Sequence, residues 1–460
     1  MNEFKKIITK LSNFSEIDFH VGITLLFRFW SILVGGILLV SIPFYLTGAE
    51  QGYYFTFSSL IATQVFFELG FNFVVVQIVS HEMPGLSYGS NGSLSGRHDN
   101  VSRLSSLIIL LKKWYLLISI LYFIIVSIIG FIFFSTNGHL PKLDWLPVWI
   151  LLVLFSSINL YISPFLAVLE GMGFVGQVAK IRLMQSCVGY GCFFILLLFG
   201  AGLYSIVCIS GVAALFSYTW LMKTHSKLIK EHHKVDKAAP VISWKKEIFP
   251  FQWKIALSWL SGYFIFQLFN PLVFAYQGAV EAGRVGLTLT IFSTILSFSM
   301  SWVTAKSPVM AKLIAEEKIV ESKILFKKLL FKSGCSNLLI IAGFIVFVLV
   351  LRANNIDLAM RIANNNILYI LFFVSIANHI VFTMATYMRA YKKEPMIWNS
   401  LGTGLLIAVA LTFSARLSST FAIASYAFVI IGVCLPWTIM IYRDFIKINT
   451  NSRNNQDYHD

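Results

Sequence analysis

The side chains of this chain that could do chemistry are charged groups inside long apolar segments. Arg28 lies in the largely apolar segment 18–46. Roughly ten helical residues at ~1.5 Å each would place it ~15 Å below the membrane surface, near the middle of the bilayer. A guanidinium group forks onto phosphate oxygens, so Arg28 could hold an anionic ligand. Alternatively, Glu68 in the next apolar segment could pair with Arg28 and join the two helices.

Four more basic residues lie near the ends of such segments. Lys180 and Arg182 follow a turn at Glu170, and they could draw an anionic headgroup inward or anchor a helix at the membrane surface. Lys306 is favoured as an anchor of this kind. Arg284 is predicted near the outer end of its segment, where it could meet a headgroup on the other side of the membrane or form a solvated cap.

A further candidate is His379, which interrupts an apolar segment beside Asn378. Because the ordinary pKa of histidine lies near neutral pH, His379 could couple proton movement to transport. A packing histidine with satisfied hydrogen bonds is the more common alternative. His232 and His233 have no third ligand in the sequence pattern, so we expect no metal site and no cofactor.

The chain lacks the motifs of common catalytic sites. It contains no Walker motif, no nucleophile elbow and no pair of metal ligands on one helix face. The links on one side of the apolar segments are too short to build an active site. We therefore expect no enzyme activity.

Twelve long apolar segments position these side chains. Hydrophobic residues make up 57% of the 460 residues and charged residues only 12%, a composition that leaves too few polar groups to cover a soluble domain. A helix of ~20 apolar residues spans the bilayer and satisfies its own backbone hydrogen bonds there. The predicted fold class is an all-α polytopic membrane protein with 12 transmembrane helices, at residues 18–46, 52–79, 105–134, 145–169, 174–199, 203–222, 251–275, 284–305, 329–351, 367–388, 396–413 and 421–442.

The links between the apolar segments are alternately rich and poor in Lys and Arg along the chain. A link is numbered here by the apolar segment that it follows. Most of the 36 Lys and Arg residues lie in the even-numbered links and the termini. The odd-numbered links hold only Lys142, Arg284, Arg352, Arg361 and Arg416. By the positive-inside rule, both termini are expected in the cytoplasm, and the chain is expected to cross the membrane many times. The net charge of +15 therefore favours anionic lipids as partners and not nucleic acid.

A polar link at residues 223–247 divides the chain into two halves of six helices. The predicted units are an amphipathic segment (1–17), an N-terminal bundle (18–222), this cytoplasmic linker, a C-terminal bundle (248–445) and a cytoplasmic tail (446–460). Glu50-Gln51-Gly52 opens the second helix much as Glu281-Ala282-Gly283 opens the eighth, which indicates an internal repeat. Halves of six helices share one orientation, so a pseudo-twofold axis along the membrane normal relates them, and substrate would bind between them.

Several passages resemble the Wzx-type polysaccharide-unit (O-antigen) flippases of the multidrug/oligosaccharidyl-lipid/polysaccharide exporter superfamily. They are residues 251–264 (FQWKIALSWLSGYF), residues 281–288 (EAGRVGLT), and Ser301–Trp302 with Lys306 and Pro308. The six-plus-six layout extends the resemblance over nearly the whole chain.

The resemblance implies two bundles that form a V around a cationic cavity. It implies a substrate of a short glycan on undecaprenyl pyrophosphate, turned from the cytoplasmic to the periplasmic leaflet for lipopolysaccharide or another surface polysaccharide. Polysaccharide polymerase and export proteins are then expected partners. In this hypothesis Arg28 with Lys180 or Arg182 holds the pyrophosphate, and Trp259 and Tyr263 contact sugars.

Two other functions compete with this interpretation. A cation-coupled multidrug exporter of the same superfamily would need acidic groups for cationic drugs, and Glu68 is the only carboxylate deep in a predicted span. A glycan polymerase or ligase would need a large outer loop, which the spacing of the apolar segments does not provide.

Overall fold

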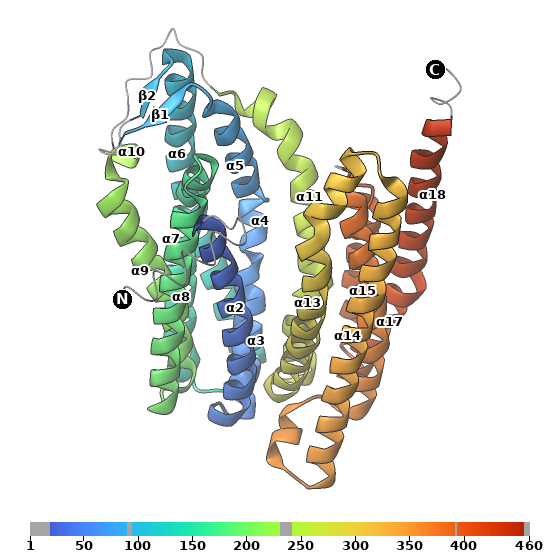
Figure 1. Ribbon diagram of the computed structural model, residues 1–460. Coiled ribbons are helices and arrows are strands. Elements are labelled where there is room, and N and C mark those ends of the chain that lie inside the picture. The colour runs from blue at the N-terminus through green and yellow to red at the C-terminus, as the bar shows by residue number, and fades with distance from the viewer. Residues whose placement is uncertain (1–18, 90–93, 231–241, 392, 455–460) are drawn as a thin grey trace, which may run out of the picture. The chain divides into compact units, whose positions relative to one another are not determined.

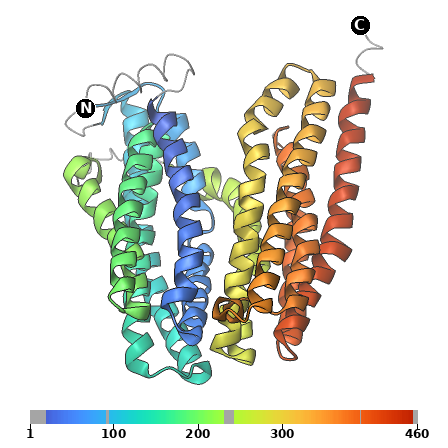
Figure 2. The ribbon, with the colours of Figure 1, turned by 60° about the horizontal axis from the view of Figure 1, so that its bottom comes forward.

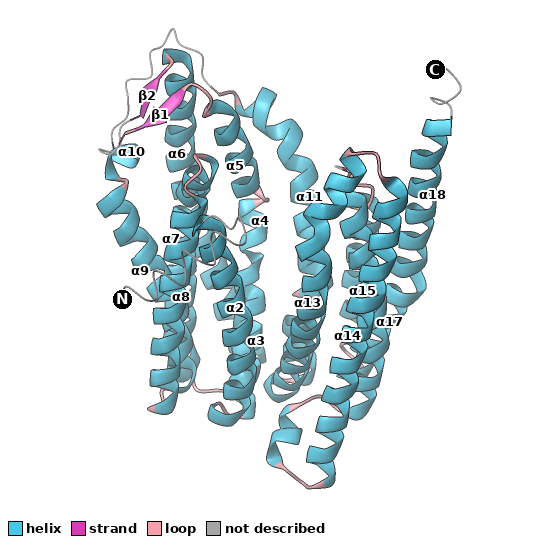
Figure 3. Ribbon diagram, viewed as in Figure 1, coloured by secondary structure: helices cyan, strands magenta, loops and turns pink. Residues whose placement is uncertain are grey.

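The computed structural model describes residues 19–89, 94–230, 242–391 and 393–454. The predicted amphipathic segment 1–17 lies outside the described residues, as do residues 231–241 of the predicted linker. Figure 3 shows that helices account for nearly all of the described chain. The fold class expected from composition, an all-α protein with long apolar helices, is confirmed.

The elements follow one another as helices with a single small hairpin (Figure 1). The first part of the chain contains α2 (Phe19–Tyr45), α3 (Gly48–Ile61), η1 (Ala62–Gln64), α4 (Val65–Glu68), α5 (Phe71–Glu82), β1 (Leu86–Tyr88), β2 (Leu94–Gly96), α6 (His98–Asn137), α7 (Lys142–Gly171), α8 (Val175–Leu198), η2 (Gly202–Ile206), α9 (Val207–Thr224) and α10 (Ser226–Lys230). The second part contains η3 (Trp244–Ile248), α11 (Phe249–Phe266), α12 (Phe269–Gln277), α13 (Ala279–Ala315), α14 (Ile319–Ala353), η4 (Asp357–Arg361), α15 (Asn365–Arg389), α16 (Ile397–Ser414), α17 (Ser419–Val429), η5 (Ile430–Cys434) and α18 (Leu435–Asn454).

Each of the twelve predicted spans has a helical counterpart. Within the described residues, ten helices are long and apolar enough to cross a membrane, and the bent pair Gly48–Glu68 and Phe71–Glu82 is an eleventh if counted as one span. The predicted first span corresponds to α2, whose part Phe29–Tyr45 is a shorter apolar helix. Several helices exceed the predicted lengths. The 40 residues of α6 would extend ~60 Å, about twice the hydrocarbon thickness, so this helix reaches well beyond the bilayer core.

Three of the spans are interrupted, each for a local reason. Leu69 and Gly70 both have positive φ, 50° and 66°, and they end α4 before α5 begins. Pro271 lies just after the break between α11 and α12, because proline fits the first turn of a helix. The π-helical turn η5 precedes Pro436, which cannot donate the next hydrogen bond of a regular helix.

Contacts divide the chain into two compact units. Unit 1 consists of residues 1–38, 63–136 and 140–256, and unit 2 of residues 39–62, 137–139 and 257–460. In unit 2, α13 packs against α3, α14 and α15. Figure 2 shows α13, α14 and α15 running side by side. The helix α3 therefore groups with the helices of the second half of the chain.

Unit 1 has its core between α5, α6, α7 and α9. The indole of Trp149 on α7 is fully buried against α6, where a Cβ on Gly130 would lie 2.1 Å from the ring. At one end of the unit, the hairpin of β1 and β2 docks through Tyr88, whose hydroxyl shares a 2.8 Å hydrogen bond with Nδ1 of His225. Nearby, Arg103 of α6 bridges Glu82 of α5 at 2.9 Å and Glu247 of η3 at 2.5 Å. Residues 84–89 and 94–100 are thus tied to the bundle.

Candidate functional site

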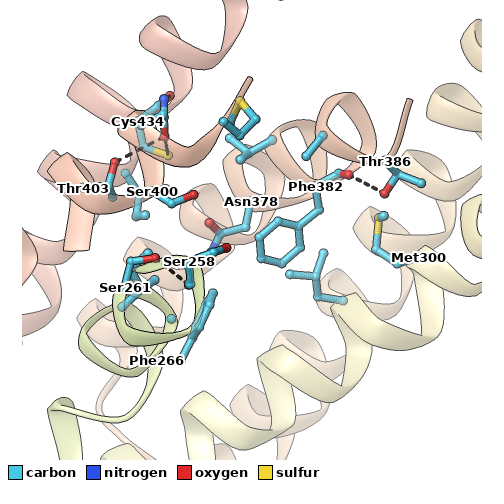
Figure 4. Close-up of a pocket in the computed structure, with 18 of the residues that line it drawn as sticks. Ser258, Ser261, Phe266, Met300, Asn378, Phe382, Thr386, Ser400, Thr403 and Cys434 are labelled. Atoms are coloured by element: carbon cyan, nitrogen blue, oxygen red, sulfur yellow. Dashed lines mark hydrogen bonds between the residues drawn. The ribbon is translucent and has the colours of Figure 1, made fainter. Parts of the chain in front are cut away.

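One cavity inside unit 2 lies among α11, α13, α15, α16 and η5 (Figure 4). Its volume is about 420 Å³, which is in the range of small-molecule sites. One wall is apolar, with Phe266, Met300 and Phe382. Short polar side chains from α11, α15 and α16 also line the cavity, and together they are called the polar wall.

The polar wall arises from the spacing of residues on α16. Asn399 and Thr403 are four residues apart on an otherwise apolar helix and therefore share one face. Nδ2 of Asn399 donates to the carbonyl oxygen of Cys434 at 3.2 Å and to Oγ1 of Thr438 at 3.4 Å. Thr403 donates to Oδ1 of Asn399 at 3.4 Å. These bonds tie α16 to η5 and α18, and the side chains of Asn399, Thr403 and Thr438 are buried.

The other polar residues of the wall come from α11 and α15. Asn378 donates to the hydroxyl of Tyr426 at 3.4 Å, and Ser261 donates to the carbonyl oxygen of Ser258 at 2.8 Å. Figure 4 shows Ser258 and Ser261 next to one another on α11, with Asn378 of α15 close by. Neutral hydroxyl and amide groups of this kind can hold the hydroxyls of a polar ligand or solvent.

Arg389 is the charged side chain among the residues that line this cavity. It lies in the last turn of α15, is about half exposed, and its Nε forms an ion pair of 2.9 Å with Glu394. The cavity is therefore neutral along its length, with a cation at one end.

The aromatic residues predicted to contact sugars lie on α11 but do not line the cavity. Tyr263 is buried, with 8% of its surface exposed, whereas Trp259 is 45% exposed. His379 on α15 points elsewhere: its Nε2 shares a 2.7 Å hydrogen bond with Oγ of Ser333 on α14, and only 3% of it is exposed. That contact is the one expected of a packing histidine. Lys306 is exposed on α13.

The predicted residues of unit 1 are not gathered in one described cavity. Arg182 on α8 forms an ion pair of 2.9 Å with Glu170 at the end of α7, and Lys180 is exposed. The carboxylate of Glu68 on α4 interacts with the side chains of Gln64 and Asn72. Arg28 lies on α2, but its side chain lies outside the described part of the chain, so its pairing with Glu68 stays a prediction.

Arg284 belongs to a different cavity of unit 2, at the start of α13. Its Nε donates to the carbonyl oxygen of Met360 at 2.8 Å, and its Nη1 lies 3.4 Å from Glu281.

Within the described residues, no three His, Cys, Asp or Glu side chains gather as metal ligands.

The sequence interpretation passed over the polar residues of α16 because it searched for charges. Asn399, Ser400 and Thr403 are uncharged, but their placement at positions i, i+1 and i+4 of an apolar span was visible in the sequence. Arg389 was counted only as part of the cytoplasmic excess of cations.

The chain is similar in fold to two solved transporters. An inward-facing multidrug resistance MATE family transporter of the MOP superfamily aligns over 89% of this chain and 99% of its own, with 12% identity and a TM-score of 0.54. The lipid II flippase MurJ, in an inward closed conformation, aligns over 93% of this chain and 90% of its own, with 15% identity and a TM-score of 0.60. No protein-family model and no curated protein sequence matches the chain. At these identities the likeness establishes the fold.

Proposed function

We propose that the protein is a transporter of the MOP superfamily that moves a lipid-linked anionic substrate across the bacterial inner membrane. The observation that carries the proposal is the likeness in fold to a lipid II flippase over nine tenths of both chains. Length and composition agree with it, since the described helices are long, apolar and joined by short links. The substrate we favour is an oligosaccharide on undecaprenyl pyrophosphate, as the resemblance to polysaccharide-unit flippases implies.

The charge of the chain supports a lipid-linked anion as cargo. The protein carries a formal net charge of +15, and the lopsided distribution of its cations predicts a cytoplasmic side that attracts anionic headgroups. In this proposal Arg28 holds the pyrophosphate together with Lys180 or Arg182, because guanidinium groups bind phosphate oxygens in pairs. Arg182 would exchange its partner Glu170 for the phosphate.

The proposed transport cycle is alternating access, with the two halves of the chain opening in turn to each side of the membrane. An H+ or Na+ gradient would drive it, with Glu68 or His379 as coupling residues. Trp259 and Tyr263 would contact the sugars. Polymerase and export proteins for the surface polysaccharide would receive the product.

A multidrug exporter is the second candidate, and the fold likeness to a MATE family transporter favours it. Cationic drugs need acidic partners at depth. Glu68 is the residue of this chain that could serve, because it lies on the short helix α4 within the bent span.

Deletion of the gene in its native host would separate the two functions. For the flippase, surface polysaccharide is lost, lipid-linked units accumulate, and a plasmid copy restores both. Growth in cationic drugs should remain as in the parent strain. Intact polysaccharide together with increased drug sensitivity would contradict the flippase and support the exporter.

A further inference from the structure

A second cavity of unit 2, separate from the one in Figure 4, gathers arginines that the sequence places far apart. It has a volume of about 490 Å³ and lies where α13 begins, α14 ends and α15 begins. Arg284 and Arg352 line it, and Arg361 lines a smaller cavity of about 170 Å³ that also contains Arg284. These are three of the five cations that the charge pattern predicts on the outer side of the membrane.

The positive charge of this cavity is only partly compensated. Arg352 donates to neutral oxygens: Oδ1 of Asn365, and the carbonyl oxygens of Ala363 at 2.5 Å and Ile362 at 3.4 Å. The charges of Arg352 and Arg284 are close enough to repel one another. Bringing like charges together costs free energy unless an anion offsets the repulsion.

One carboxylate, that of Glu281, lines the cavity, and its two oxygens contact different partners. Oε2 of Glu281 lies 3.4 Å from Arg284, a long contact, while Oε1 accepts a hydrogen bond of 2.6 Å from Ser419. Two guanidinium groups thus face a single carboxylate among the lining residues. Asp357, in the same link, lines neither cavity.

The first turn of α15 adds to the positive potential. Asn364 caps this 25-residue helix by accepting a hydrogen bond from the backbone of Ile367 at 3.0 Å, and Asn364 and Asn365 both line the cavity. The free backbone N–H groups at the start of a helix and its dipole favour an anion. Two guanidinium groups and a helix start are a combination that binds phosphate oxygens.

We propose that this cavity binds a phosphate or pyrophosphate group, held by Arg284 and Arg352 at the start of α15. With the orientation predicted by the charge pattern, the site lies at the outer side, where it would receive the headgroup of the transported lipid as it leaves. That role rests on the proposed function, whereas the anion site rests on the cavity alone.

Binding of inorganic pyrophosphate to the purified full-length protein tests the site. We expect saturable binding by calorimetry at constant ionic strength. Arg284→Gln should weaken it about tenfold or more, since charge-assisted hydrogen bonds to a phosphate are lost. Arg284→Lys keeps the charge without the fork and should have an intermediate effect. Arg352 is a poor test position because it also holds the link after α14.

Arg416→Gln is the matched control. Arg416 is another cation predicted on the outer side, but it stacks over the ring of Tyr276 at 5.4 Å and lines neither cavity. The Arg416→Gln variant should bind pyrophosphate with the same affinity as the unchanged protein. Absence of saturable binding, or equal affinity in Arg284→Gln and the unchanged protein, would overturn the inference. The thermal midpoint of each variant shows that it is folded.

The same titration in nanodiscs distinguishes two sources of the phosphate. If phosphatidylglycerol added to phosphatidylcholine nanodiscs competes with pyrophosphate, membrane lipid headgroups occupy the site; if it does not, the site prefers a pyrophosphate. Both results uphold a phosphate site. The tests of site and function can fail separately. A protein that exports glycan but does not bind pyrophosphate at this cavity would refute only the site. A protein that binds pyrophosphate there but is not needed for glycan export would refute only the flippase.

Discussion

The carboxamide of Gln51 on α3 donates a hydrogen bond of 2.8 Å to the carbonyl oxygen of Gly283 on α13. These residues belong to the two motifs, Glu50-Gln51-Gly52 and Glu281-Ala282-Gly283, whose similarity indicated an internal repeat. The matched motifs therefore contact each other within unit 2. The contact is close because both helices place a glycine there, and a Cβ on Gly283 would lie 2.8 Å from the backbone nitrogen of Gly52.

Gly52→Ala should destabilise the packing of α3 against α13. The added Cβ would lie 1.8 Å from the carbonyl oxygen of Ala279, so the backbones must move apart. Overpacking of this kind costs about 1–3 kcal/mol, and we expect a value toward the upper end because the obstacle is backbone. Thermal unfolding of the purified protein in detergent would measure the loss.

Gly343→Ala on α14 is the control for that substitution. Nothing lies within 4 Å of a Cβ at Gly343, and alanine in a helix interior is favoured over glycine by about 0.5–1 kcal/mol. This variant should be as stable as the unchanged protein or more stable. Equal midpoints for Gly52→Ala and Gly343→Ala would show that α3 and α13 are not in close contact.

The buried amide of Asn399 should hold the polar wall of the cavity in Figure 4 together. Asn399→Leu removes the donor to Cys434 and Thr438 and leaves their oxygens without that partner. We expect a loss of about 1–2 kcal/mol in the free energy of unfolding. Ser400→Ala, on the same helix and the same cavity wall, should change it by less than about 0.5 kcal/mol. Similar losses in the two variants would contradict a specific role for the amide.

Local features of the fold were predictable from the sequence. The spans follow from runs of apolar residues, and the breaks near Pro271 and before Pro436 follow from proline chemistry. Pro271 lies in the first turn of α12 and not at the break itself, because proline fits there without strain. Helix ends beyond the bilayer were not predictable, since polar residues such as those at the start of α6 do not report whether a helix continues into water.

Contacts between distant segments were not predictable. Tyr88 meets His225 across 137 positions of the sequence, and nothing in the composition of either segment specifies the other. Arg284 and Arg352 were counted as separate outer cations, whereas the structure places them in one cavity. The charge pattern reports the side of a membrane on which a residue lies but not which neighbours it has.

A double-mutant comparison of glycan export tells whether Arg28 holds the pyrophosphate or forms a structural ion pair with Glu68. If Arg28 holds the pyrophosphate, Arg28→Ala should reduce surface polysaccharide at least about tenfold, because charge-assisted bonds to phosphate are lost. Glu68→Gln should then leave the amount of protein in the membrane unchanged, because no ion pair is broken. Complementation of the deletion strain, followed by measurement of surface polysaccharide, distinguishes the variants.

A purely structural pair gives a different pattern. Removal of one partner then leaves a buried charge at a cost of about 3–5 kcal/mol, so both single variants should lose export through poor folding. The combination of Arg28→Ala and Glu68→Ala should recover stability and export. Protein levels in the membrane must be measured alongside, since a structural effect lowers them and the loss of a phosphate ligand does not.

His225 should make unit 1 less stable as the pH falls. Burial lowers the pKa of His225 below its ordinary value of 6.5, and only 3% of the residue is exposed. Its Nδ1 is bonded to Tyr88, and its Nε2 has no hydrogen-bond partner among the described residues. The imidazolium form would therefore be desolvated beside Phe174 and Trp220, and folding favours the neutral form.

The sign of this effect follows from proton binding in the two states. Between the folded pKa and 6.5, the unfolded chain binds a proton that the folded chain does not, so the free energy of unfolding falls as the pH is lowered through that window. One group contributes at most about 1.4 kcal/mol per pH unit. In thermal unfolding between pH 7.5 and 5, His225→Phe should remove this part of the pH dependence, and Tyr88→Phe should retain it because the imidazole stays buried. An unchanged slope in His225→Phe would show that other groups titrate on unfolding.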